Sequence, residues 1–208
     1  TGLQEAFALN GESLCYGEEQ ITSSDYAQLL GERSRNDSHA KDSVGESGPF
    51  LTGALARARL AADKKLRFDM PAETYGIHGN NFAQASEIGW TLKRIGQLLE
   101  TLHQADMSEP LRTTLKQANG GVATAATEAP RGLLIHHYVV DEGGKVVAAD
   151  VVTPTAINQR VMAAQIMADL ANEKDHQRLC KVAERIVRAY DPCISCAVHL
   201  VRVEKSHS

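Results

Sequence analysis

The spacing of apolar residues predicts an amphipathic helix from about Asn81 to His103. Apolar side chains recur in this segment at steps of three and four residues, which places them on one face of an α-helix. The face consists of Ala85, Ile88, Leu92, Ile95, Leu99 and Leu102.

Three further helices are predicted downstream. Pro110 can open a short one that runs to about Gln117, because proline is tolerated in a first turn. Thr155 is expected to cap a helix that runs to about Leu170, and Asp175 is expected to cap the last one. The side chains expected to face inward are Ile157, Val161, Ala164 and Met167 in the first of these two helices, and Leu179, Val182, Ile186 and Ala189 in the second.

A β-hairpin is predicted between the helical segments. Residues 133–140 and 145–152 are β-branched and apolar, and the turn between them contains Gly143 and Gly144. Such a pair of runs around a glycine turn is typical of two antiparallel strands. The fold class predicted is therefore α+β, predominantly helical, with helices packed against a hairpin.

The first part of the chain lacks such patterns. Residues 31–48 are rich in Ser, Asp, Glu, Arg and Gly without apolar periodicity, which favours an irregular segment. We therefore expect residues 1–50 to form a long irregular segment and residues 51–208 to form the packed, functional part.

Composition narrows the class of protein. The chain has 208 residues, 43% of them hydrophobic, and a net charge of −4. This composition is globular, and the charge argues against binding to nucleic acid. No signal peptide is recognised, and Cys15 and Cys180 are isolated cysteines that we expect to be small buried residues. A reduced compartment, the cytoplasm, is expected.

The strongest chemical signal is a C-x-x-C-x-x-H motif formed by Cys193, Cys196 and His199. It follows Asp191-Pro192, which must end the last helix because the residue before a proline is excluded from the α region. Two thiolates on a fixed turn suit a soft metal such as nickel, iron, copper or zinc. Taken alone, the motif is compatible with structural zinc, a redox dithiol or another metal site. A closed zinc site needs four ligands, so either this site is incomplete or its metal is not structural zinc.

Four segments together resemble the large subunit of nickel–iron hydrogenases, in its carboxy-terminal portion. They occur in the family's order, and their wording is closest to the cytoplasmic NAD(P)- or deazaflavin-linked enzymes. The segments are Gly53-Ala54-Leu55-Ala56-Arg57, Glu128 to His136 (E-A-P-R-G-L-L-I-H), Val152 to Asn158 (V-T-P-T-A-I-N) and Asp191 to His199 (D-P-C-I-S-C-A-V-H).

This resemblance implies a set of metal ligands. Cys193 would be a terminal thiolate on nickel, and Cys196 would bridge nickel and iron. His199 and the backbone carbonyl of Leu134 would help to bind a Mg²⁺ ion. The implied reaction is the reversible, heterolytic splitting of H₂, with electrons passing to iron–sulfur clusters in a partner subunit.

The resemblance also implies the surroundings of the iron, which carries CN and CO ligands. Arg131 would donate to one cyanide and overhang the open metal position, and Thr155 would donate to the other. The apolar wall around the CO would consist of Ala129, Pro130, Leu134 and Pro154. Simpler roles stay open at this stage: a salt bridge for Arg131 and a helix N-cap for Thr155.

Two departures from the family pattern shape the expected partners. The chain lacks the second, amino-terminal C-x-x-C, so another chain or segment must supply it. Residues 200–208 follow His199, where a maturation endopeptidase cuts many family members. Further expected partners are the small iron–sulfur subunit and NAD(P)- or deazaflavin-linked diaphorase subunits.

Two alternative functions stay open for the chain. It could be a zinc-stabilised interaction module, or a hydrogenase-like scaffold subunit that has lost its site.

Overall fold

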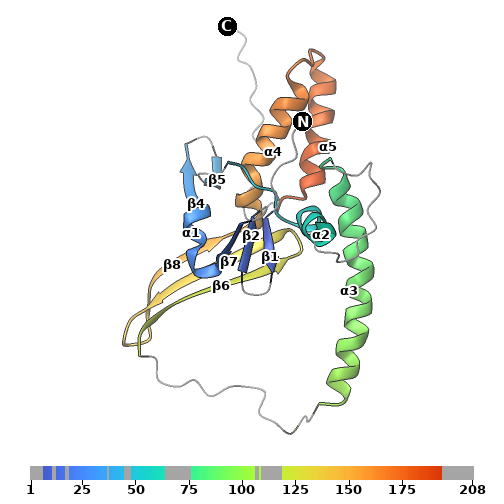
Figure 1. The fold of residues 1–208 in the computed structure, drawn as a ribbon. Helices are drawn as coiled ribbons and strands as arrows, with labels where there is room; N and C mark the ends of the chain where they lie inside the picture. The colour runs from blue at the N-terminus through green and yellow to red at the C-terminus, as the bar shows by residue number, and fades with distance from the viewer. Residues whose placement is uncertain are drawn as a thin grey trace.

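A computed structural model describes most of the chain (Figure 1). Helices and β-sheets both contribute to its core, as an α+β fold requires, whereas the predominance of helix stays a prediction. The described residues are 7–10, 13–16, 19–36, 38–44, 48–63, 76–105, 108 and 119–193.

A three-stranded antiparallel sheet lies at the centre of the fold. It consists of β6 (Gly121–Ala129), β7 (Gly132–Val140) and β8 (Val146–Val152), in that order. The predicted hairpin of residues 133–152 is confirmed as β7 and β8. Strand β6 was not predicted, because alternating Ala and Thr residues carry little apolar periodicity. It pairs with β7 along its whole length, so a tight turn joins Ala129 to Gly132.

Strands also occupy the first 50 residues, so the prediction of an irregular segment over residues 31–48 is wrong. Strands β4 and β5 pair there as an antiparallel ladder. The sequence pattern missed them because backbone hydrogen bonds hold the pair together, while exposed polar side chains such as Arg33 and Ser34 line it. The boundary near residue 50 stays a prediction. The elements are β1 (Phe7–Asn10), β2 (Ser13–Tyr16), β3 (Glu19–Thr22), a 3-10 helix (Ser23–Asp25), α1 (Tyr26–Leu29), β4 (Gly31–Arg35) and β5 (Ser38–Val44).

Four longer helices lie toward one end of the sheet (Figure 1). They are α2 (Ala54–Asp63), α3 (Gly79–His103), α4 (Pro154–Leu170) and α5 (His176–Tyr190). The predicted helices that end near residues 103, 170 and 190 are confirmed. The one expected over residues 110–117 lies outside the described residues.

The inward faces of α4 and α5 were predicted only in part. Ile157 and Val161 are buried, as are Ile186 and Ala189. Ala164 and Met167 are exposed, because α4 and α5 form a helical hairpin whose far end reaches beyond the sheet (Figure 1). The predicted N-cap Asp175 is confirmed: its carboxylate accepts hydrogen bonds from the amides of Gln177 and Arg178.

Two apolar clusters form the core. One fills the space between α2, α4 and α5 and includes Leu55, Val161 and Tyr190. The other joins one face of the central sheet to the amino-terminal elements through Leu133 and Phe50. Helix α4 contributes to both clusters, so the sheet and the helices pack as one body around its first turns.

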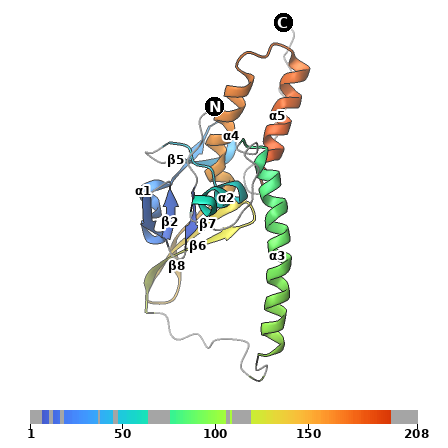
Figure 2. The same ribbon diagram turned by 45° about the vertical axis from the view of Figure 1, so that its right-hand side comes forward.

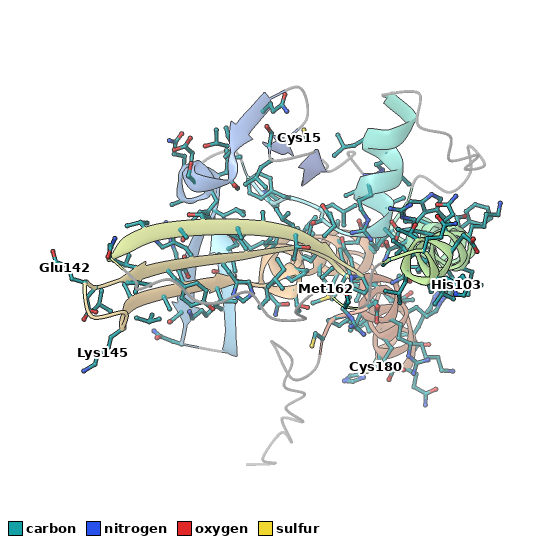
Figure 3. The ribbon with its side chains drawn as sticks, turned by 90° about the horizontal axis from the view of Figure 1, so that it is seen from below. Cys15, His103, Glu142, Lys145, Met162 and Cys180 are labelled. Atoms are coloured by element: carbon teal, nitrogen blue, oxygen red, sulfur yellow. The ribbon has the colours of Figure 1, made fainter. Side chains whose placement is uncertain are left out.

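The two isolated cysteines differ from each other. Cys15 is buried on β2, as predicted, whereas Cys180 is exposed on α5, which corrects the expectation of a buried residue. The two cysteines lie far apart in the molecule (Figure 3). Among the described helices, none is both long enough and apolar enough to cross a membrane.

Candidate functional site

The candidate site is built on the turn that follows α5. Asp191 ends the helix in the left-handed region, with φ 50° and ψ 54°, and its amide donates to the carbonyl of Arg188 at 3.1 Å. Aspartate tolerates this region better than most residues. The helix therefore ends before Pro192 as predicted, and the left-handed residue redirects the chain toward Cys193.

Arg131, which lies in the turn between β6 and β7, binds the turn that follows α5. The Nε–H of Arg131 donates to the backbone carbonyl of Asp191 at 2.8 Å, and its Nη2 donates to the Asp191 carboxylate at 3.3 Å. Gln84 of α3 donates to the same carboxylate at 3.1 Å. Asp191 is thus fixed by the β6–β7 turn and by α3, and it orients the guanidinium of Arg131.

Thr155 meets the cysteine turn from the first turn of α4. Its side chain is buried, and its hydroxyl accepts a hydrogen bond from the amide of Cys193 at 3.1 Å. The prediction that Thr155 caps the helix is wrong, because Thr153 is the N-cap and its hydroxyl accepts from the amide of Ala156 at 3.3 Å. Pro154 takes the first helical position, so α4 starts two residues earlier than predicted. Thr155 is left to face Cys193.

Arg57 on α2 anchors the turn that carries Arg131. Its guanidinium makes two hydrogen bonds to Glu87 of α3, at 2.6 and 2.7 Å, and one to Glu128 of β6 at 2.5 Å. It also donates to the carbonyls of Ala129 and Pro130, each at 3.2 Å. Burial lowers the pKa of Arg57, but the Glu87 hydrogen bonds and the charges of Glu128 and Glu87 outweigh it, so that its pKa is raised. The side chain is a permanent cation at the base of the turn.

The backbone at Thr52 and Gly53 lies very close to the backbone at Arg131 and Gly132. This close approach fixes the other side of the β6–β7 turn. Gly53 and Gly132 both have positive φ, at 115° and 130°. A Cβ on Gly132 would lie 2.6 Å from the Cγ2 of Thr52, and one on Gly53 would lie 2.8 Å from the Arg131 carbonyl oxygen. Only glycine tolerates both the backbone region and the contact.

Hydrogen bonds connect this approach to α4. Thr52 accepts from the amide of Leu133 through its hydroxyl at 2.9 Å. The Asn158 side chain accepts from the amide of Thr52 at 2.9 Å and donates to its carbonyl at 3.0 Å. Asn158 therefore attaches the Val152–Asn158 segment to Thr52, just before α2 begins.

The close approach gives a first prediction. Gly132→Ala is expected to lower the free energy of unfolding by about 1–3 kcal/mol, because alanine would be strained at this φ and would clash with Thr52. Gly96→Ala on α3 is the control, since apart from the nearby backbone of its own helix no heavy atom lies within 4 Å of its added Cβ. A helical site of this kind is expected to gain about 0.5–1 kcal/mol. Chemical denaturation measures both, and equal stability of Gly132→Ala and the parent chain would contradict the close approach.

Some of the predicted site residues therefore lie close together in the structure. Arg131, Cys193 and Thr155 converge on the turn after α5, with Pro154 beside Thr155 and with Ala129 and Pro130 in the arginine-bearing turn. Leu134 is half-buried on β7, opposite Thr127 of β6. Cys196 and His199 lie outside the described residues. Within the described ranges, no group of three or more His, Cys, Asp or Glu side chains could hold a metal ion.

Sequence reasoning assigned no site role to three residues that organise the site. Asp191 and Arg57 lie inside the segments quoted above: Asp191 directly precedes a proline, and Arg57 follows Gly53 by four residues. Gln84 had no such signal, because its partner Asp191 is 107 residues away along the chain.

Comparisons with known proteins agree with the motifs. A family model described as nickel-dependent hydrogenase matches residues 67–199. Sulfhydrogenase 2 subunit alpha of Pyrococcus furiosus is 37% identical over 183 residues, which cover 80% of this chain and 42% of the relative. Sulfhydrogenase 1 subunit alpha of the same organism is 34% identical over 96% of this chain and 48% of the relative. The chain thus spans less than half the length of these curated relatives.

Solved structures give the same result. A NAD⁺-reducing NiFe hydrogenase in the H₂-reduced state matches with a TM-score of 0.71 and 25% identity, over 96% of this chain and 51% of that one. The NiFeSe hydrogenase of Desulfovibrio vulgaris Hildenborough has the same fold, with a TM-score of 0.64 at 18% identity over 95% of this chain and 53% of that one. From the family match over most of its length, this chain belongs to the nickel-dependent hydrogenase family.

Proposed function

We propose that this chain is the carboxy-terminal part of the catalytic large subunit of a nickel–iron hydrogenase. The observation that carries the proposal is the convergence of two elements, the β6–β7 turn and α4, on the turn that carries Cys193. Arg131 from the β6–β7 turn binds Asp191, and Thr155 from α4 binds the amide of Cys193. A guanidinium and a buried hydroxyl that are distant in sequence therefore both bind the turn that carries the Cys193 thiol.

The residues present fit a Ni–Fe centre. The Thr155 hydroxyl accepts from Cys193, so its own hydrogen can still be donated to an anionic ligand next to that cysteine. Arg131 uses Nε and Nη2 on Asp191, and a guanidinium has further N–H groups for a second anion such as cyanide. Soft sulfur from Cys193 suits nickel.

When bound, the centre would supply a Lewis-acidic site at which H₂ is polarised. Cys193 and Cys196 would hold the Ni–Fe centre, and His199 and the Leu134 carbonyl would help to hold Mg²⁺. The Cys193 sulfur, or a group in the segment from Glu128 to His136, would be the base that holds the proton. The Arg131 guanidinium would donate hydrogen bonds to an anionic ligand of the centre.

Apolar groups would keep water from the CO ligand. Ala129 and Pro130 line the arginine-bearing turn, and Leu134 and Pro154 belong to the neighbouring strand and helix. Because Asp191 fixes both the direction of Arg131 and the turn that carries Cys193, it would act as a positioning residue for both.

The proposed partners follow from the motifs, because the sequence given holds one C-x-x-C. A separate chain or segment would supply the amino-terminal C-x-x-C, and a small subunit with iron–sulfur clusters would accept the electrons. NAD(P)- or deazaflavin-linked diaphorase subunits, a maturation endopeptidase and a cytoplasmic location complete the proposal. A further relative, the NAD-reducing hydrogenase HoxS subunit beta of Cupriavidus necator, supports a nicotinamide-linked assembly, at 32% identity over 74% of this chain and 35% of the relative.

Metal analysis with infrared spectroscopy tests the proposal. The complete complex, purified without oxygen, is expected to contain about one nickel ion per chain, together with iron. Infrared bands of CN and CO bound to iron are expected in the same sample. Zinc alone, without these bands, would support the zinc-stabilised module instead. A complex without any of these metals would support the site-deficient scaffold.

A further inference from the structure

A polar stripe runs along the first turns of α3. It consists of Asn80, Gln84 and Glu87, which follow each other at steps of four and three and therefore share one face of the helix. Figure 2 shows the start of α3 beside the end of α5, and α3 also contacts α2. The stripe therefore lies where the helix that carries Arg57 meets the helix that ends at the cysteine turn.

Asn80 fixes the start of α3 against both of these helices. Its side-chain amide donates to the carbonyl of Ala189 in α5 at 2.9 Å, and its side-chain oxygen accepts from the amide of Leu55 in α2 at 3.1 Å. Asn80 is 7% exposed, so water competes little for these hydrogen bonds. Because Gln84 follows one turn later on the same face, its side chain reaches Asp191 from a fixed base.

Gln84 holds the carboxylate that Arg131 binds. The side-chain amide of Gln84 donates to Oδ2 of Asp191 at 3.1 Å, and Nε of Arg131 lies 3.2 Å from the same oxygen. Nη2 of Arg131 donates to the other carboxylate oxygen, Oδ1, at 3.3 Å. Gln84 thus fixes the plane of the carboxylate, and this plane determines which edge of the guanidinium faces Asp191.

The Arg131–Asp191 ion pair needs such a third group. The two side chains are 42% and 40% exposed. Ion pairs with this exposure contribute little by themselves, because water competes with them and both side chains must be ordered. Gln84 is half-buried on an anchored helix, so its hydrogen bond restricts the carboxylate where the ion pair alone does not. The direction of the guanidinium therefore depends on Gln84.

Glu87 holds the backbone of the same arginine. It accepts two hydrogen bonds from Arg57, at 2.6 and 2.7 Å, and Arg57 in turn donates to the carbonyls of the two residues that precede Arg131. The backbone of the arginine-bearing turn is thus held through Glu87, and the guanidinium is held through Gln84. One face of α3 positions both ends of the Arg131 side chain.

We propose that Gln84 is a positioning residue for Arg131. By holding the Asp191 carboxylate it commits Nε and Nη2 of Arg131 to Asp191, which leaves Nη1 and the second hydrogen of Nη2 for another anion. The assignment of that anion to a cyanide of a Ni–Fe centre rests on the proposed function. The effect of Gln84 on Arg131 does not rest on it.

Proton exchange at the Arg131 guanidinium tests the proposal in the full chain, without metal. The Nε–H of Arg131 is followed by NMR with ¹⁵N-labelled arginine and is assigned by its loss in Arg131→Lys. Gln84→Met keeps the length of the side chain but cannot donate, and it is expected to speed exchange with water by about threefold or more. Exchange at the Nε–H of Arg57 is expected to stay as in the parent chain.

Two further variants separate positioning from general packing. Gln84→Lys restores a donor of at least the same reach and is expected to bring exchange at Arg131 back to within about twofold of the parent chain. Gln97→Met makes the first substitution on the exposed part of α3, where Gln97 accepts from Arg94 at 3.1 Å, and is expected to leave Arg131 unchanged. Circular dichroism checks that each variant folds.

Infrared spectra of the complete complex give a second readout besides turnover. If Arg131 donates to a cyanide, Gln84→Met is expected to shift a CN band more than the CO band, and Gln84→Lys is expected to return it. A parent complex without CN and CO bands would end the hydrogenase proposal and leave the exchange result standing. Unshifted CN bands together with faster exchange would contradict only the cyanide role of Arg131.

Three results would overturn the positioning role of Gln84. The first is unchanged exchange at Arg131 in Gln84→Met. The second is equal acceleration at Arg131 and Arg57, which would mean that α3 loosens as a whole. The third is a failure of Gln84→Lys to slow the exchange again. If Gln84→Met does not fold, Gln84→Asn takes its place with the same expected result, because its donor is one methylene too short to reach Asp191.

Discussion

Replacement of Cys193 by serine is expected to remove nickel from the assembled complex and to lower H₂ turnover by more than about 100-fold. Changes in the groups that merely support a metal ligand cost about 10–100-fold, so loss of a ligand itself should cost more. The serine hydroxyl stays protonated at neutral pH, and its hard oxygen is a poor substitute for a soft thiolate. Nickel content and H₂ uptake of the purified complex measure the effect.

Folding should survive this change, which makes the loss attributable to sulfur. Cys193 is attached to Thr155 through its backbone amide, and serine keeps that hydrogen bond. The turn itself is held by Arg131 and Gln84 on Asp191, which the variant leaves intact. The melting temperature is therefore expected to stay within about 2 °C of the parent chain.

Cys180→Ser provides a matched control. The same atom is exchanged on the exposed side of α5, where the Sγ of Cys180 lies 3.6 Å from Nδ1 of His176. This variant is expected to keep both nickel and turnover, and Cys196→Ser is expected to lose both. Normal turnover in Cys193→Ser, or an equal loss in Cys180→Ser, would remove Cys193 from the proposed metal centre.

Local patterns in the sequence predicted the elements that carry the site. Apolar periodicity predicted three of the long helices, β-branched runs around a glycine turn predicted β7 and β8, and Asp191-Pro192 predicted the end of α5. These features depend on neighbours within one or two turns of chain. The motif in residues 128–136 and the cysteine turn could be singled out for the same reason: each is a contiguous run of unusual residues.

Long-range features could not be predicted in this way. The polar ladder of β4 and β5 is held by backbone pairing that leaves no apolar signal. Arg57 meets Glu87 and Glu128 at separations of 30 and 71 residues, and no local pattern specifies such partners. The apolar face of α3 was predicted from its periodicity, but residues 88–102 are exposed, because a sequence pattern does not specify which elements pack against a helix.

The Arg57 cluster leads to the second large effect. Arg57→Met is expected to lower the free energy of unfolding by about 3–5 kcal/mol, because two largely buried carboxylates lose their cation. The side chains of Arg57, Glu87 and Glu128 are only 18%, 22% and 19% exposed, so water compensates little. For a chain of this size the melting temperature should fall by about 6–15 °C in thermal unfolding.

An exposed ion pair is the control. Arg178 lies 3.1 Å from Glu173, but its side chain is 72% exposed. Arg178→Met is therefore expected to change the free energy of unfolding by less than about 1 kcal/mol, as is usual for surface pairs. The comparison separates the burial of the Arg57 cluster from the mere loss of an arginine.

Neutralising the carboxylates tests the physical cause. In the triple variant Arg57→Met/Glu87→Gln/Glu128→Gln no buried charge is left without its counterion, so more than half of the lost stability should return. Arg57→Lys keeps the charge but lacks the planar fork that reaches two carboxylates and the carbonyls of Ala129 and Pro130, and it should lie between the parent chain and Arg57→Met. If the triple variant is no more stable than Arg57→Met, the loss comes from the missing anchor of the Ala129–Pro130 turn, and charge burial at Glu87 and Glu128 is not its cause.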